Sequence, residues 1–210
     1  VMMTRKGMIK RTPYSEFANL RKTGLIALTL REDDELVSVN LTDGSMSLIL
    51  ASRQGRALRF QESAIRVIGR TGMGVKAMKL REDDELIDMS MLLPGQQVLA
   101  ITENGYGKRT PIEEYPTQHR GGQGVFTINM TAKKGMLADV KVVNPGDEII
   151  IMSEDGLTVR TPVSGISQQG RSTQGVHIMN VADEDKVSVI AISKRAKKRV
   201  HKNELGQEEI

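Results

Sequence analysis

The feature that most constrains this chain is an internal repeat of about fifty residues. A glycine that precedes a short segment with a basic end recurs at spacings of 48, 50 and 51 residues, at Gly7, Gly55, Gly105 and Gly156. A second glycine, which precedes an apolar residue, recurs at spacings of 50, 50 and 51 residues, at Gly24, Gly74, Gly124 and Gly175. Marks that keep register across four copies indicate a repeat architecture in which each unit is one supersecondary motif.

A third mark follows the second glycine by ten residues. It is acidic in three copies, at Asp34, Asp84 and Asp185, and the third copy has Lys134 at this place. Glycines and turn dipeptides interrupt every stretch that could reach helical length, which argues against a helical solenoid. Each unit is therefore expected to hold four short strands, at 1–4, 8–11, 25–30 and 35–41 in the first copy.

Four-stranded units of this length are typical of the blades of propeller-like domains. We predict an all-β fold, a single domain over residues 1–193 with blades near 1–43, 44–92, 93–143 and 144–193. Residues 194–210 form a basic and then acidic polar tail, either a solubilising segment or an arm on nucleic acid. Because Val1 opens directly on a strand-like segment without a leader, we expect the chain to be a fragment of a longer polypeptide.

Composition narrows the chemistry that the chain can perform. It has no cysteine, so disulfides and thiolate metal sites are excluded, and this fits a cytoplasmic protein. The three histidines, at 119, 177 and 201, lie far apart, and acidic turns such as 32–34 lack the ligand spacing of a calcium loop. We predict no metal site and no cofactor, interpret the acidic turns as solvated, and expect no membrane span.

Basic residues gather at the first hairpin of each unit and in the loop that follows it. Equivalent positions of a radial repeat lie at equivalent heights, so these cations would form one track around the rim, suited to the phosphates of double-stranded DNA. The alternative is a solvated surface of mixed charge. The predicted DNA-binding residues are Arg5, Lys6, Lys10, Arg11, Arg21, Lys22, Arg53, Arg56, Arg59, Arg66, Arg70, Lys108, Arg109, Arg120, Arg160 and Arg171.

Several strings resemble one known family, the C-terminal domain of the DNA gyrase A subunit, across essentially all of residues 1–193. They are Gly105-Tyr-Gly-Lys-Arg-Thr110, Glu114-Tyr-Pro-Thr117, Val159-Arg-Thr161, Gly170-Arg-Ser-Thr-Gln-Gly-Val176 and Arg59-Phe-Gln-Glu-Ser63. The resemblance implies a β-pinwheel whose blades exchange strands and whose basic rim bends DNA, as part of a bacterial, nucleoid-associated enzyme. It also implies two protein partners, the remainder of the gyrase A subunit, together with the gyrase B subunit. The implied role is in ATP-dependent negative supercoiling.

The chain departs from that family in two respects. It shows four units where the family usually has six, and they resemble the last four. A glycine-rich loop approaches the family's signature box, with His and Gln in place of two basic residues, at Gln118, His119, Arg120, Gly121, Gly122, Gln123 and Gly124. Glycines allow close approach of backbone amides to phosphate, but they could equally shape a loop between blades. The family's DNA-cleaving tyrosine belongs to another domain, so the three tyrosines here inherit no such role.

Other functions stay open on the sequence. The related decatenating topoisomerase IV carries a degenerate version of the same domain, and a propeller can also act as a protein-interaction scaffold. An enzyme ranks last, because no pair of nucleophile and base and no metal constellation emerges from the sequence.

Overall fold

The computed structural model describes residues 1–20 and 22–193, so Arg21 and the predicted tail lie outside it. Within these residues the chain forms fifteen short strands and five 3-10 helices, and all the strand pairs are antiparallel. The predicted all-β fold is confirmed. The 3-10 helices are η1 (Tyr14–Phe17), η2 (Glu62–Ala64), η3 (Ile112–Glu114), η4 (Ala132–Lys134) and η5 (Val163–Gly165).

The strands form four sheets, which we call blades 1 to 4. Blade 1 has the order β3 (Leu36–Val39), β1 (Met2–Thr4), β2 (Met8–Lys10), β6 (Val75–Lys76). Blade 2 has the order β10 (Val125–Phe126), β5 (Arg56–Gln61), β4 (Ser47–Ser52), β7 (Leu86–Leu92). Blade 3 has the order β11 (Leu137–Val143), β8 (Gln97–Thr102), β9 (Tyr106–Pro111), β14 (Val176–His177). Blade 4 has three strands, β13 (Thr158–Pro162), β12 (Glu148–Ser153) and β15 (Val187–Ser193).

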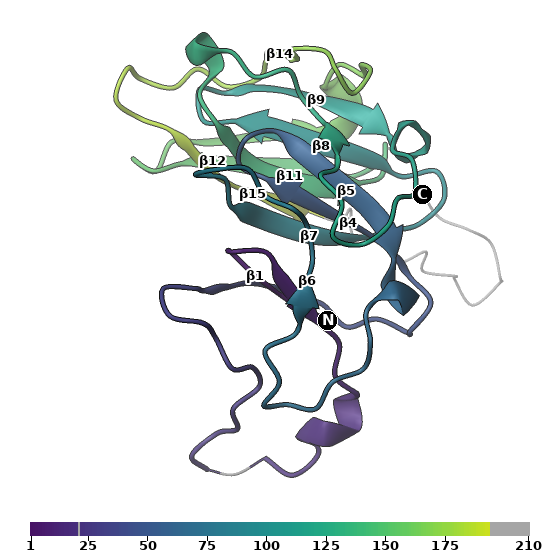
Figure 1. The fold of residues 1–210 in the computed structure, drawn as a ribbon. Helices are drawn as coiled ribbons and strands as arrows, with labels where there is room; N and C mark the ends of the chain where they lie inside the picture. The colour runs from purple at the N-terminus through teal and green to yellow at the C-terminus, as the bar shows by residue number, and fades with distance from the viewer. Residues whose placement is uncertain (21, 194–210) are drawn as a thin grey trace, which may run out of the picture.

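Neighbouring units exchange strands, as the resemblance described above implies, so blades 1 to 3 each contain a strand of the following unit. The short strand of each following unit completes the preceding blade: β6 pairs with β2, β10 with β5 and β14 with β9. The segment 25–30 is the equivalent of these strands in the first unit, and it forms no strand. Strands β6, β10 and β14 each pair with the hairpin of the preceding unit. The described residues contain no such hairpin before the first unit, so the segment 25–30 has none to pair with. The segment instead extends away from the sheets (Figure 1).

The second glycine of each repeat allows this exchange. Gly74, Gly124 and Gly175 have φ of 96°, 69° and 73°, in the left-handed region that favours glycine. A Cβ atom at Gly124 would lie 2.4 Å from the Ala57 carbonyl oxygen, on the hairpin that the exchanged strand joins. The equivalent distance at Gly74, to the Ile9 carbonyl oxygen, is 2.6 Å. Glycine is required because two backbones meet at these points.

The acidic mark of the repeat closes the hairpin turns. The Asp34 carboxylate accepts the backbone N–H of Lys6 at 2.8 Å. In the second unit Asp84 accepts the N–H of Gln54 at 2.9 Å, and in the fourth Asp185 accepts that of Asp155 at 3.1 Å. The interpretation of these turns as solvated is therefore wrong for the last aspartate of each turn. Its carboxylate accepts a backbone N–H of the hairpin turn that would otherwise have no hydrogen-bond partner.

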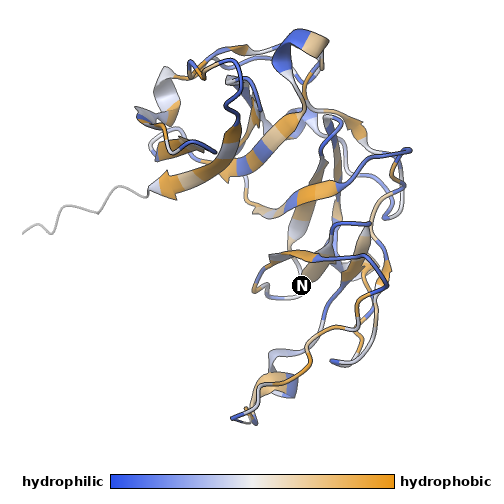
Figure 2. Cartoon of the chain, turned by 90° about the vertical axis from the view of Figure 1, so that its left-hand side faces the viewer, coloured by the Kyte–Doolittle hydropathy of each residue, from blue (hydrophilic) through white to orange (hydrophobic). Residues whose placement is uncertain are grey.

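The core lies between blades rather than within them. Three clusters of buried apolar side chains fill the interfaces between blades 1 and 2, 2 and 3, and 3 and 4. Strands β3, β7, β11 and β15 of successive blades contact one another, while the exchanged strands lie at the opposite edge of their sheets. In Figure 1 β1 and β6 of blade 1 lie below the labelled strands of the other blades, and Figure 2 shows apolar residues along the strands and polar ones in the loops. We call the edge formed by the exchanged strands the rim.

Candidate nucleic-acid interface

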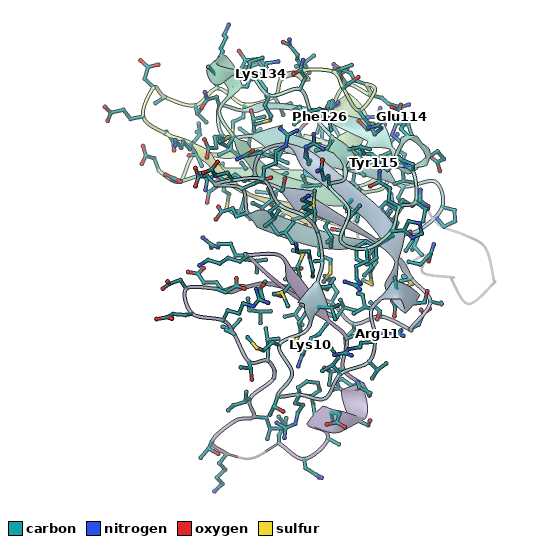
Figure 3. All side chains as sticks on the ribbon, in the orientation of Figure 1. Lys10, Arg11, Glu114, Tyr115, Phe126 and Lys134 are labelled. Carbon is teal, nitrogen blue, oxygen red and sulfur yellow. The ribbon has the colours of Figure 1, made fainter. Side chains whose placement is uncertain are left out.

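Two of the predicted DNA-binding lysines are buried. Lys10 and Lys108 are both 0% exposed, which removes them from the set of residues that can reach a phosphate. The Lys10 ammonium donates to the carbonyl oxygens of Gly69, at 3.1 Å, Arg70 and Gly72, at 3.2 Å. Figure 3 labels Lys10 within the N-terminal blade. Burial lowers its pKa from the ordinary value.

Lys108 repeats this arrangement in blade 3. Its ammonium donates to the carbonyl oxygens of Gly170 and Arg171, the latter at 2.6 Å, and to the Thr173 hydroxyl at 3.0 Å. Burial lowers the pKa of Lys108 to about 8, the nearby Glu114 carboxylate opposes this effect, and the Arg171 charge adds to it. Both lysines thus hold a loop of the following unit against their own blade.

Two arginines in the second strand of their hairpins, Arg59 and Arg109, join neighbouring blades. Arg59 donates to the carbonyl oxygens of Ile112 at 3.0 Å and Tyr115 at 3.2 Å, the first residue of η3 and the residue that follows η3. Arg109 donates to the Ile166 carbonyl oxygen at 2.7 Å, after η5. Of the other two predicted residues of this kind, Arg11 lies 3.7 Å from the buried Glu62 carboxylate and Arg160 pairs with Glu148. The contacts of Arg59 and Arg109 hold neighbouring blades together, whereas the Arg160 side chain is 64% exposed and pairs within blade 4.

Arg5 and Arg53 belong to a chain of ion pairs that crosses all four units. Arg5 pairs with Glu35 at 2.8 Å and lies 3.7 Å from Glu85. Arg53 pairs with Glu85 at 3.0 Å and with Glu103 at 2.6 Å, and Lys186 lies 3.6 Å from Glu103. We call these six residues the ion-pair ladder. Their charges are compensated within the protein.

Three of the predicted loop arginines donate to backbone carbonyl oxygens of the preceding unit. Arg70 donates to the Ile26 carbonyl oxygen at 2.9 Å, and Arg171 to that of Phe126 at 3.1 Å. Arg120 donates to the Lys76 carbonyl oxygen and, through Nε, to the Ala64 carbonyl oxygen at 3.0 Å. The acceptors at positions 26, 76 and 126 are spaced by fifty residues, so these contacts are equivalent in three units. Each arginine has donors left over, and Arg120 and Arg171, whose acceptors are on β6 and β10, lie at the rim.

The glycine-rich loop 118–124 packs against segment 76–79 of the preceding unit. The Gly121 N–H donates to the Ala77 carbonyl oxygen at 2.8 Å, and the Lys79 N–H donates to that of Gly122 at 2.8 Å. Arg56 donates to the carbonyl oxygen of Gly124 at 3.1 Å and approaches that of Gln123 at 3.4 Å. At the start of the loop the Gln118 N–H bonds the Arg59 carbonyl oxygen at 2.8 Å, and His119 is exposed. The loop is thus built into the joint between two blades.

A concentration of cations surrounds this loop. We call it the loop-118 surface, and it consists of Arg56, Arg66, Lys76, Lys79, Arg81 and Arg120. Lys76, Lys79, Arg66 and Arg81 are exposed, and no side-chain hydrogen bond or ion pair engages them in the described part of the chain. Burial and the like charge of Arg81 lower the pKa of Arg56, and Asp84 opposes this. Uncompensated like charges at an exposed loop favour binding of a polyanion.

Three members of this surface were missed by the sequence interpretation. Lys76 and Lys79 lie in the equivalent of the strand expected at 25–30 and Arg81 follows it, whereas the predicted track followed the hairpins and the loops after them. What marks these three residues as surface cations is their place at the exposed end of the exchanged strand β6. That place follows from the pairing of β6 with β2. Of the remaining predicted residues, Lys6 and Lys22 are exposed, and Arg21 lies outside the described residues.

The exposed cations of the loop-118 surface offer groups that can bind an anion. No group of three or more His, Cys, Asp or Glu residues that could hold a metal ion occurs in residues 1–20 and 22–193. In the same residues, no helix is long and apolar enough to cross a membrane. The fold and the site together define a β-pinwheel repeat domain with exchanged strands and a cationic loop surface at its rim.

Comparison with known proteins identifies the family. The family model described as "DNA gyrase C-terminal domain, beta-propeller" matches residues 1–43, 47–92, 96–144 and 147–194. The DNA gyrase A subunit of Haloquadratum walsbyi is 41% identical over 191 residues, covering 90% of this chain and 22% of that protein. The DNA gyrase A subunit of Staphylococcus aureus is 37% identical over 193 residues, covering 91% and 22%. The chain belongs to the DNA gyrase C-terminal domain family.

Solved structures agree with this assignment. The C-terminal domain of DNA topoisomerase IV matches with a TM-score of 0.87 and 26% identity, over 92% of this chain and 61% of that chain. The DNA gyrase A C-terminal domain matches with a TM-score of 0.83 and 27% identity, over 91% and 64%. The chain therefore spans less than two thirds of these domains and 22% of the two gyrase A proteins.

Proposed function

We propose that this chain is the non-catalytic, DNA-wrapping part of a type IIA topoisomerase, the DNA gyrase A subunit. The observation that carries the proposal is the loop-118 surface, four of whose cations are exposed and make no side-chain hydrogen bond or ion pair in the described residues. Family membership supports the same function. Lysine and arginine side chains neutralise phosphates and release counterions, which supplies most of the affinity of sequence-tolerant DNA binding.

Wrapping follows from placing such contacts on the rim of several blades. A duplex that follows successive blades must bend, and bending 20–30 base pairs costs on the order of 1–6 kcal/mol. Several phosphate contacts on consecutive blades offset this cost. In the proposed enzyme the bent segment is presented to a cleavage site elsewhere in the gyrase A protein, and ATP-dependent strand passage involving the gyrase B protein yields negative supercoils. This chain itself holds no cofactor in that scheme, and its partners are duplex DNA and those two proteins, in the bacterial cytoplasm.

A specific observation favours a second candidate, the corresponding domain of topoisomerase IV. That domain's solved structure superposes on this chain with a TM-score of 0.87, slightly above the 0.83 of the gyrase A domain. The curated relatives at 41% and 37% identity are both gyrase A proteins, which is why gyrase is preferred. A supercoiling assay of the complete enzyme separates the two, since only gyrase introduces negative supercoils.

The DNA-binding proposal is tested by removing the free cations. Lys76→Ala, Lys79→Ala and Arg81→Ala together remove up to three phosphate contacts, so the slope of log Kobs against log salt concentration should fall by about 2.7. Affinity should fall alike for unrelated sequences, because phosphate contacts carry no sequence information. The measurement is fluorescence anisotropy of a labelled duplex across a salt series.

A matched control removes three cations of the ion-pair ladder, by Arg5→Ala, Arg53→Ala and Lys186→Ala. The change in formal charge is the same, but these side chains are already paired with carboxylates. The control should keep the salt slope of the unaltered protein. Equal slopes in all three proteins, or equal losses in both variants, would contradict a DNA contact at the loop-118 surface.

A further inference from the structure

One large apolar side chain, Phe126, lies beside two arginines of the loop-118 surface. It lies on the exchanged strand β10, at the rim of blade 2, and is 45% exposed. The Arg56 guanidinium carbon lies 4.5 Å from the centre of its ring, and that of Arg81 lies 6.0 Å from it. Figure 3 labels Phe126 on the side of the molecule that also carries Lys134. An exposed phenyl ring between two cations has no role in the apolar cores, none of which includes it.

Backbone pairing holds this ring in place. Phe126 pairs with Arg56 across the sheet, and its carbonyl oxygen accepts from Arg171 at 3.1 Å. Arg56 is in turn fixed by the carbonyl oxygen of Gly124 at 3.1 Å. The ring therefore projects from a backbone that three contacts fix, next to guanidinium groups that can bind phosphate.

We propose that Phe126 is an apolar DNA contact, which packs against deoxyribose or a base edge in the minor groove while Arg56 and Arg81 bind the flanking phosphates. This inference rests on the proposed DNA-binding function. Proteins that bend DNA combine minor-groove cations with apolar side chains that press on or between base steps. Charge complementarity selects a polyanion as the occupant, and the apolar faces of duplex DNA lie in its grooves beside the phosphates.

The register of the repeat agrees with a rim position for this contact. The residues equivalent to Phe126 are Lys76 on blade 1 and His177 on blade 3, and both are exposed. His177 packs edge-on against Tyr106, with ring centres 4.8 Å apart. The same edge position thus presents a cation, a phenyl ring and an imidazole on three consecutive blades, all of which suit contact with a duplex.

The contact predicts a salt-independent loss of affinity. About half of the ring is exposed, so burying it on DNA should contribute about five- to tenfold in affinity. Phe126→Ala should lose this factor at every salt concentration, with the slope of log Kobs unchanged, and should reduce the bend measured by energy transfer between labels at the duplex ends. Phe126→Leu should retain part of the affinity. Leu93→Ala, at an apolar residue that is 52% exposed between β7 and β8, should change neither.

The outcomes separate this inference from the proposed function. If the unaltered protein shows no salt-dependent duplex binding, the proposed function fails. If it binds and Phe126→Ala binds equally well at all salt concentrations, only the apolar contact is refuted. If Phe126→Ala lowers the salt slope by about two phosphates' worth, the ring merely positions Arg56 and Arg81, which also overturns the inference. Thermal melts of each variant exclude unfolding as the cause.

Discussion

Lys108→Met distinguishes a structural lysine from a DNA-binding one. The Lys108 ammonium is buried and donates to two carbonyl oxygens and one hydroxyl in the loop 170–173. Methionine has a similar length but no donor, so the Arg171 carbonyl oxygen would lose its partner, whereas that of Gly170 keeps the Thr173 hydroxyl at 2.8 Å. We expect loss of stability without loss of DNA contacts.

The magnitude follows from the three acceptors. A hydrogen bond to a charged group contributes about 1.5–3 kcal/mol, and a buried acceptor left without a partner costs about 1–3 kcal/mol. Relief from burying the ammonium offsets part of the gross loss, so we expect about 3–5 kcal/mol. For a domain of this size that lowers the melting temperature by about 6–20 °C.

The assay pairs thermal melts with a salt series of duplex binding. Lys133→Met, at an exposed lysine of the same unit, is the matched control and should leave the melting temperature unchanged. The salt slope of Lys108→Met should equal that of the unaltered protein. A variant that melts normally but loses about 0.9 from the slope would refute the structural role and place Lys108 on a phosphate.

Three further predictions concern stability. Burial lowers the pKa of Lys108 to about 8, so between pH 8 and about 10.4 the folded protein binds fewer protons than the unfolded chain. Its unfolding free energy, measured by denaturant titration, should therefore rise with pH in this window relative to that of Lys108→Met. A difference between the two proteins that does not depend on pH would contradict the lowered pKa. Gly124→Ala, at φ 69° and facing a carbonyl oxygen 2.4 Å away, should cost about 3 kcal/mol in the same assay, whereas Gly146→Ala, with nothing within 4 Å, should be near neutral. Arg53→Ala should cost at most about 1 kcal/mol at low salt, and the cost should shrink in 1 M salt if the ion-pair ladder acts as surface charges do.

The architecture could be predicted because its causes are local. Gly7 and Gly55 have φ of 89° and 81°, as the hairpin turns require, and such turns leave a periodic signature in the sequence. The exchange of strands could not be derived from the same pattern. Whether the segment 75–76 joins its own hairpin or the preceding one depends on contacts distant in sequence, and both pairings have the same alternation.

The candidate site was predicted less well, because a basic residue can recur at the same position of each repeat for two reasons. A binding residue and a structural residue both recur when every unit has the same fold. The position of Lys10 and Lys108 is occupied by Leu58 and Val159 in the other two units, and that alternation of lysine with aliphatic residues is the sequence signal of an interior position. Arg59 and Arg109 gave no such signal, since their partners are backbone carbonyls, which every sequence supplies.

Strand exchange also creates the loop-118 surface. Lys76 lies on the edge of blade 1, Arg56 on blade 2, and the loop 118–124 that joins them comes from the third unit. No single unit holds all of these groups, so the surface forms only when neighbouring blades are correctly packed. The structural lysines and arginines keep the blades in register, and the exposed cations act on that fixed framework. Affinity for DNA is therefore coupled to the interfaces between blades, and a substitution that loosens one of them should weaken binding without touching a phosphate contact.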